Sequence, residues 1–155
     1  IFNVRKIARE SDRLAAFVIG TNDLVKELRA DHVPGRTPLL TSLSMALLAG
    51  REAGIAVLDG VYNNVKDADG FRAECEQGRD FGFDGKTLIH PGQVEVCNEV
   101  FAPSEAAVEE AEGIIAAWEA GAGAGVVTYN GKMIENLHVD IARRVLATHA
   151  AITSA

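Results

Sequence analysis

The sequence predicts an α/β fold made of consecutive β/α units of a parallel barrel. Three short apolar stretches each stop abruptly at polar residues, and helical patterns lie between them. The stretches and the polar residues that end them are residues 14–19 with Asp23, residues 55–58 with Asp59, and residues 87–89 with His90. In parallel barrels the chemistry gathers at the carboxyl ends of the strands. These three side chains therefore indicate where the function lies.

The first expected strand, residues 14–19, is nearly all apolar, as suits a strand that is buried on both faces. We expect Gly20–Asp23 to form the turn after it. Thr37 is expected to cap the next helix, with Pro38 at its first position. Gly54 then fits the left-handed position at the end of that helix.

The second expected strand is Ile55–Leu58. Residues 66–70 offer caps for a helix that runs to about Gly78. Thr87–Ile89 form the third expected strand, and Pro91 starts another helix after it.

The last third of the chain has a different pattern. Ser104 is expected to cap a long amphipathic helix. The glycines of residues 121–125 follow this helix, whereas a dinucleotide-binding loop needs glycines between a strand and a helix, so we interpret them as a flexible linker. A β-like run at residues 126–129, a turn at Asn130–Gly131 and a helix from about Leu137 complete the pattern.

Composition narrows the class of protein. The 155 residues are 48% hydrophobic and 24% charged, which is typical of a globular domain, and the net charge of −7 argues against a nucleic-acid partner. No apolar run approaches the roughly 20 residues that span a bilayer, so we expect no membrane partner. Cys75 and Cys97 lie in separate helical patterns and are expected to stay reduced, which favours a cytoplasmic or an organellar matrix location, and of these we expect the cytoplasm.

The start of the chain raises a question of completeness. The sequence begins at Ile1 without a Met, and residues 1–10 already have a helical pattern. About three strands are present, fewer than a closed (β/α)8 barrel contains. The chain is therefore either part of a longer polypeptide or an open α/β sheet.

Several short motifs occur together in a fixed order. They are Gly20-Thr-Asn-Asp-Leu24, Asp59-Gly-Val61, Gly82-Phe-Asp-Gly-Lys86, Ile89-His-Pro-Gly-Gln93, Asn98-Glu-Val-Phe-Ala-Pro-Ser104 and Gly131-Lys-Met-Ile-Glu135. Across essentially the whole chain, these motifs resemble the carboxyl-terminal half of the HpcH/HpaI aldolase and citrate lyase β-subunit family. Within the family, the resemblance is to the malyl-CoA and citramalyl-CoA lyases in particular.

The resemblance implies a TIM (β/α)8 barrel of which this chain holds the last three strands. Residues 1–103 would form these last β/α units, and residues 104–155 would form carboxyl-terminal helices and a lid. The lid of this family reaches the active site of a neighbouring subunit, which implies a homo-oligomer, a trimer or hexamer.

The resemblance also implies a divalent metal, Mg²⁺ or Mn²⁺, held by one Glu and one Asp. The Asp corresponds to Asp23, and the backbone amides near Asn22 and Asp23 would hold the substrate carboxylate. The Glu, and an Arg that binds the substrate, would precede Ile1. A carboxylate at a strand end suits a hard cation; the alternative is that Asp23 caps the following helix.

The resemblance also implies roles for Glu135 and for the loop that contains His90 and Pro91. Glu135 matches a lid position where most of the family has an Asp that shuttles a proton; its extra methylene moves the carboxylate by about 1 Å, enough to affect rate. The alternative is a cap-region carboxylate. His90 and Pro91 lie in the loop near coenzyme A, although a lone His is more often a hydrogen-bonded structural residue.

The remaining polar residues have no assigned chemistry. Asp59 either faces a pocket or ties down its loop. Lys86 is expected to precede a strand at the opposite end of the barrel and to serve stability. Because no Lys is expected at a strand's carboxyl end, a Schiff-base mechanism is not indicated. The other histidines show no ligand spacing; these are His32, His138 and His149.

The predicted function is cleavage of a carbon–carbon bond in a 3-hydroxyacyl-CoA thioester, with the divalent cation as Lewis acid. Malyl-CoA, methylmalyl-CoA or citramalyl-CoA would yield an acyl-CoA and a small 2-oxo acid. One alternative is a malyl-CoA thioesterase. Another is a catalytically incomplete barrel fragment, since this chain alone lacks the second metal carboxylate and the substrate Arg and is expected to be inactive.

Overall fold

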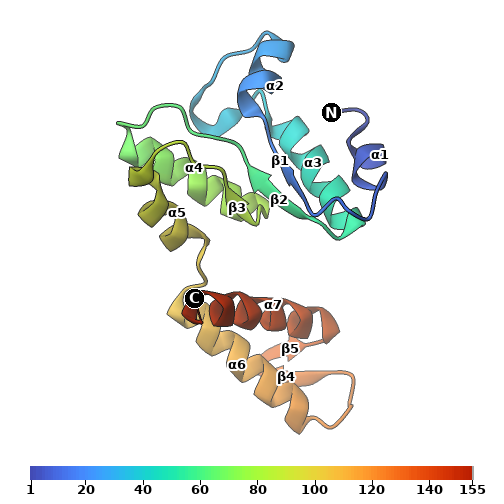
Figure 1. Ribbon diagram of the computed structural model, residues 1–155. Coiled ribbons are helices and arrows are strands. Elements are labelled where there is room, and N and C mark those ends of the chain that lie inside the picture. Colours follow the sequence, from blue (N-terminus) through green and yellow to red (C-terminus); the bar gives the residue numbers. More distant parts are fainter. Residues whose placement is uncertain (155) are drawn as a thin grey trace. The chain divides into compact units, whose positions relative to one another are not determined.

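The structure, a computed structural model, describes residues 1–154. It divides into two compact units, unit 1 from Ile1 to Phe101 and unit 2 from Ala102 onward (Figure 1). Each unit is described by itself. The functional division at residue 103, into barrel units and a lid, stays a prediction.

Unit 1 is built on a three-stranded parallel sheet in the order β1-β2-β3. The strands are β1 (Ala16–Val18), β2 (Ala56–Asp59) and β3 (Gly85–Lys86). Because all three strands are parallel, their carboxyl ends meet at one edge of the sheet, where Val18 is in register with Leu58 and Asp59 with Lys86. Unit 1 is therefore an α/β fold, as expected.

Helices connect and cover these strands (Figure 1). They are α1 (Val4–Ala8), α2 (Thr21–Leu28), α3 (Leu40–Ala53), α4 (Ala68–Phe81) and α5 (Val94–Phe101), with 3₁₀ turns η1 (Pro34–Arg36) and η2 (Pro91–Gln93). Helix α3 packs on β1 and β2, and α4 packs on β3 and α5. This places α3 and α4 as the crossovers that parallel strands require.

Two apolar clusters hold unit 1 together. Leu39, Leu43 and Val57 are at most 1% exposed in the cluster beneath the sheet. A second cluster contains Cys75 and Cys97, which are free and buried, and burial raises the pKa of the Cys75 thiol to about 12. These cysteines act as small apolar residues.

The third strand was predicted at the wrong residues. It comprises Gly85–Lys86 and not Thr87–Ile89. Thr87 directly follows this strand, and both its amide and its hydroxyl donate to the Asp59 carbonyl, at 3.0 and 2.9 Å. A Lys is a poor sign of a buried strand, and here it is tolerated only because carboxylates surround its ammonium group.

Two expected local features also differ. The turn predicted at Gly20–Asp23 is the beginning of α2, which starts directly at Thr21. Thr37 has helical backbone angles and caps nothing; α3 begins only at Leu40. The Gly54 prediction is confirmed, since Gly54 ends α3 with φ 71°.

Unit 2 is a pair of helices with a β-hairpin between them. The elements are α6 (Glu105–Ala120), β4 (Val127–Tyr129), β5 (Lys132–Ile134) and α7 (Asn136–Thr153). Ser104 caps α6 by accepting from the Ala107 amide at 3.2 Å, as predicted. Asn130 and Gly131 turn the hairpin with φ of 47° and 75°, the left-handed pair that a tight hairpin requires.

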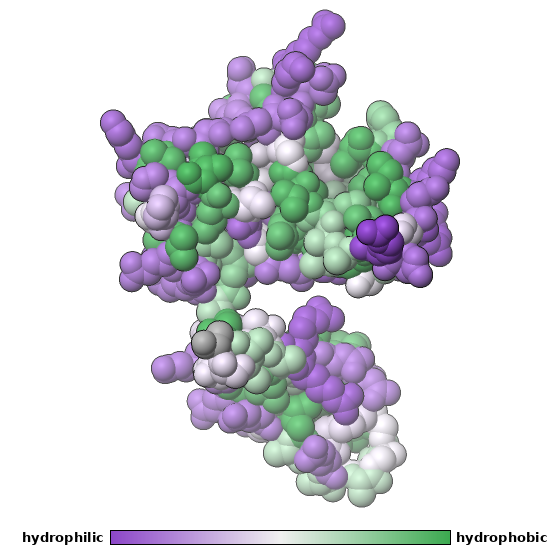
Figure 2. All heavy atoms as spheres, viewed as in Figure 1, coloured by the Kyte–Doolittle hydropathy of each residue, from purple (hydrophilic) through white to green (hydrophobic). Residues whose placement is uncertain are grey.

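Apolar side chains remain on the surface of unit 1 (Figure 2). Phe2, Val18 and Ile89 are 90%, 60% and 52% exposed, and Val18 ends the outer strand β1. Within residues 1–154, no helix combines the length and apolar character needed to cross a membrane.

The cap of α4 makes a testable acid–base pair. Asp67 accepts from the Gly70 amide at 2.9 Å and from the Tyr62 hydroxyl at 2.7 Å. The hydroxyl bond lowers the pKa of Asp67 and, with burial, raises the pKa of Tyr62 to about 12.

We expect the tyrosinate absorbance of Tyr62 to appear only near pH 12. The Y129F variant leaves Tyr62 as the sole tyrosine, because the sequence has two. Asp67→Asn in that background should return the midpoint toward the ordinary pKa of 10, since the charged acceptor is gone. An unchanged midpoint in the Asn variant would contradict the pairing.

Candidate functional site at the carboxyl ends of the strands

The segments after β1 and β2 are joined directly. Asn22 and Asn63 exchange two side-chain hydrogen bonds, of 3.1 and 2.7 Å between Nδ2 and Oδ1. Gly60 allows this approach, because a Cβ there would lie 2.5 Å from the Thr21 side chain and 2.7 Å from the Ile19 carbonyl oxygen. Sequence reasoning found Asn22 but missed Asn63, since no local pattern links residues so far apart.

Asp23 lies in the first turn of α2 and is exposed. The helix is preceded by Gly20, and no side chain caps it, so the capping alternative is not what the structure shows. No ion pair within residues 1–154 involves Asp23. The negative charge suits the amino end of a helix, and both carboxylate oxygens remain available.

Asp23 is a suitable but single ligand for a hard cation. Mg²⁺ takes octahedral oxygen ligands, usually one or two carboxylates with water and substrate oxygens. In the part of the chain that the structure describes, no group of three or more His, Cys, Asp or Glu side chains is arranged to hold a metal ion. The carboxylate oxygens of Asp23 suit the cation. The other ligands must come from groups that do not form a cluster with Asp23 in the described residues.

A cluster of four charged side chains, three buried and one half-buried, lies beside the carboxyl ends of β2 and β3, and we call it the charge cluster. It comprises Arg36, Asp59, Glu74 and Lys86. Arg36 Nη1 donates to both oxygens of Asp59 at 2.7 Å. Lys86 Nζ donates to Asp59 at 3.1 Å and to Glu74 at 2.7 Å. The side chains of Asp59 and Lys86 are fully buried.

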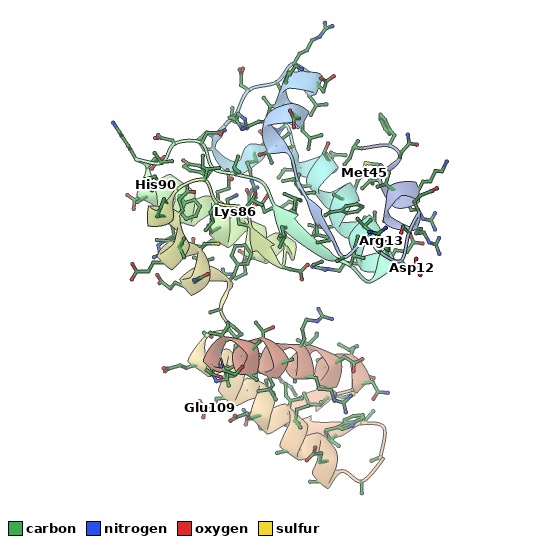
Figure 3. The ribbon with its side chains drawn as sticks, viewed as in Figure 1. Asp12, Arg13, Met45, Lys86, His90 and Glu109 are labelled. Atoms are coloured by element: carbon green, nitrogen blue, oxygen red, sulfur yellow. The ribbon has the colours of Figure 1, made fainter. Side chains whose placement is uncertain are left out.

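The charge cluster settles the role of Asp59 and corrects the placement of Lys86. The Asp59 carboxylate ties down its surroundings, one of the two alternatives. Lys86 is the last residue of β3 and lies at its carboxyl end (Figure 3), not before a strand at the opposite end. Its amine is still no Schiff-base candidate, because it is inaccessible and bonded to two carboxylates.

Arg36 is one of two residues of the charge cluster that were not predicted from the sequence; the other is Glu74. Arg36 is 4% exposed and has φ 54°, a conformation that costs roughly 1–3 kcal/mol in a residue with a side chain. Its Nε also donates to Gln77 at 2.8 Å. An Arg in a polar loop gives no sequence signal of burial; only its distant carboxylate partner explains it.

A cavity of about 450 Å³ opens next to this cluster. Its walls come from residues 32–36, residues 61–64 and α4, and they include His32, Tyr62 and Asn63. The volume is in the range of small-molecule pockets. Asn22, Asp23, His90 and Pro91 do not line it, although Asn63 connects it to Asn22.

His90 lies in the loop after β3 (Figure 3), and both His90 and Pro91 are exposed. His90 Nδ1 accepts from the Gly92 amide at 3.0 Å. A neutral imidazole with Nδ1 as acceptor carries its proton on Nε2. His90 therefore presents an Nε2–H donor outward.

Glu135 is the cap residue directly before α7 in unit 2. It forms a capping box with His138: the Glu135 side chain accepts from the His138 amide, and the Glu135 amide donates to His138 Nδ1 at 3.1 Å. The interpretation of Glu135 as a cap-region carboxylate thus has a defined geometry. His138 has a structural role in this capping box, which its spacing in the sequence did not indicate. A catalytic role for Glu135 stays a prediction.

Comparison with known proteins gives the family. Residues 1–91 match the model of the HpcH/HpaI aldolase/citrate lyase family. The chain belongs to this family, and the resemblance drawn from the motifs is confirmed.

Named relatives agree with this assignment, and a solved structure shares the fold. A (3S)-malyl-CoA thioesterase of Cereibacter sphaeroides strain ATCC 17025 is 52% identical over 99% of this chain and 54% of its own length. The citrate lyase subunit beta of Escherichia coli K12 is 39% identical over 92% of this chain and 48% of its own. The crystal structure of CitE from Mycobacterium tuberculosis in complex with magnesium, acetoacetate and coenzyme A has a TM-score of 0.79 at 24% identity, covering 95% of this chain and 56% of that one. The chain spans about half the length of the relatives that it matches.

Neutralising Asp59 should destabilise unit 1. Asp59→Asn leaves Arg36 and Lys86 with less buried negative charge, and breaking a buried pair costs about 3–5 kcal/mol. Urea unfolding followed by far-UV circular dichroism measures the change. The exposed Glu76→Gln in α4 is the control and should stay within about 0.5 kcal/mol; equal effects of the two variants would contradict a structural role for the charge cluster.

Proposed function

We propose that this chain supplies the last β/α units of a (β/α)8 barrel, with residues 104–155 as a lid. Three parallel strands in sequential order, each linked by a crossover helix, support the proposal. The outer strands β1 and β3 have unpaired edges within residues 1–154, and closure into a barrel removes such edges. Exchange of the lid between subunits of a trimer or hexamer belongs to the same proposal.

The proposed activity is that of a Mg²⁺- or Mn²⁺-dependent carbon–carbon lyase in the cytoplasm. The substrate would be a 3-hydroxyacyl-CoA such as malyl-CoA, methylmalyl-CoA or citramalyl-CoA, and the products an acyl-CoA and a 2-oxo acid. One observation carries the proposal: the Asp23 carboxylate lies in the first turn after β1, exposed and without an ion pair among residues 1–154. A CitE neighbour crystallised with magnesium, acetoacetate and coenzyme A supports the ligand set.

Each proposed site residue has a separate task. When bound, the cation polarises the oxygen that becomes the carbonyl of the 2-oxo acid. The amides of Asn22 and Asp23, at the amino end of α2, would hold the substrate carboxylate. The outward Nε2–H of His90, beside Pro91, would donate to the coenzyme A portion. Glu135, from the lid, would transfer a proton at the α-carbon of the acyl group.

Hydrolysis of malyl-CoA is the second candidate. A relative named (3S)-malyl-CoA thioesterase is 52% identical over nearly the whole chain. In addition, Glu135 stands where the resemblance leads us to expect an Asp, and this difference keeps hydrolysis as an alternative. The third candidate is a barrel fragment that is inactive by itself, because it lacks the second metal carboxylate and the substrate Arg.

Removing the proposed metal ligand should abolish metal-dependent turnover. Asp23→Asn keeps the size but weakens the oxygen ligand, so we expect kcat in the intact protein to fall by about 10³-fold or more, with loss of Mn²⁺ binding by electron paramagnetic resonance. Glu27→Gln, also exposed on α2, is the control. Full turnover by the Asn variant would exclude Asp23 from metal binding.

The products decide between lyase and thioesterase. With malyl-CoA and Mg²⁺, we expect acetyl-CoA and glyoxylate by liquid chromatography, and Glu135→Gln should slow their formation about 10²-fold because the proton-transfer group is lost. Asp140 is exposed on α7, the helix that follows Glu135. The control variant Asp140→Asn should leave the rate of product formation unchanged. Release of malate with free coenzyme A would instead establish the hydrolase.

A further inference from the structure

Gln93 joins the loop after β3 to the loop after β2. Its side chain is 3% exposed. Nε2 donates to the Tyr62 carbonyl at 3.1 Å, and Oε1 accepts from the Ile89 amide at 3.1 Å. Because both ends of this buried amide are satisfied, the side chain is held in one orientation.

The turn that Gln93 closes also carries His90. The Gln93 amide donates to the His90 carbonyl at 3.0 Å, and the Gly92 amide donates to His90 Nδ1 at 3.0 Å. A Cβ on Gly92 would lie 3.1 Å from that nitrogen, so the ring has little freedom on this side. The direction of the Nε2–H bond therefore depends on where this turn lies.

The far end of the link is itself fixed. The Tyr62 hydroxyl donates to Asp67, which caps α4. The ring of Tyr62 packs on Phe71 with a centroid distance of 6.0 Å. Gln93 thus connects the exposed turn to a loop that is anchored on a core helix.

We propose that Gln93 is a positioning residue that sets the height and direction of the His90 imidazole toward the coenzyme A thioester. This inference rests on the proposed function, in which His90 and Pro91 contact coenzyme A. Gln93 does not touch the substrate; it acts through the turn. Its loss should weaken binding of the thioester and leave the chemical step at the cation unchanged.

Gln77 provides a matched control. It also makes two side-chain hydrogen bonds, donating to the Gly35 carbonyl at 2.7 Å and accepting from Arg36 Nε at 2.8 Å. These bonds hold a loop that does not carry His90. Gln77→Leu should therefore lower stability without moving KM.

The test is steady-state kinetics of the intact protein with malyl-CoA, and calorimetric titration with free coenzyme A. We expect Gln93→Leu to raise KM and the Kd for coenzyme A roughly tenfold, with kcat within about twofold. Gln93→Glu keeps the acceptor for Ile89 but loses the donor to Tyr62, and should raise KM similarly. A KM equal to that of Gln77→Leu would overturn the inference, as would loss of the far-UV dichroism in both Gln93 variants.

Failure of the proposed function has a different signature. Wild-type protein that binds no coenzyme A, or a His90→Ala variant with unchanged KM, would remove the role of His90 itself, and the inference with it. Normal wild-type binding that weakens in His90→Ala, together with unaffected Gln93 variants, would overturn the role of Gln93 alone.

Discussion

The Asp59 carboxylate is the point on which the organisation of unit 1 depends. It accepts hydrogen bonds from Arg36, Lys86 and the Gly60 amide. Lys86 also donates to Glu74. Four segments are thereby joined: the η1 turn, the end of β2, the end of β3 and α4. Burying a charge is costly unless it is paired and hydrogen-bonded, and here two cations offset two anions.

This balance explains a strained segment. Gly35 and Arg36 both have positive φ, 76° and 54°, which a residue with a side chain seldom adopts. The conformation persists because Arg36 is held by Asp59 and Gln77 at 2.7 and 2.8 Å. The η1 turn then forms one wall of the cavity, so a buried electrostatic contact shapes a surface feature.

Sequence reasoning succeeded where local signals are strong. Apolar runs predicted the first two strands, and Asn130–Gly131 predicted the turn after residue 129, because residues that tolerate positive φ favour such a turn. The second strand of the hairpin, β5, was not predicted. It failed where the cause is distant. Lys86 seemed unsuited to a buried strand because Asp59 lies 27 residues away. The bond between Asn22 and Asn63 spans 41 residues, and the Gln93 link to Tyr62 spans 31. The strand ends and the family motifs were enough to predict the candidate site. Its supporting contacts could not be predicted, because they join residues that are far apart in the sequence.

Two aspartates at the ends of neighbouring strands show how burial separates structural from chemical roles. The oxygens of Asp59 are occupied by one amide and two cations, and its side chain is fully buried; a metal ion there would have to displace Arg36 or Lys86. Asp23 is exposed, has no ion-pair partner within residues 1–154 and lies on the amino end of α2. A hard cation binds where carboxylate oxygens are available and water can complete its shell. Because Asp59 is paired with two buried cations and Asp23 is exposed without such a partner within residues 1–154, Asp23 is the more suitable of these two aspartates as a ligand.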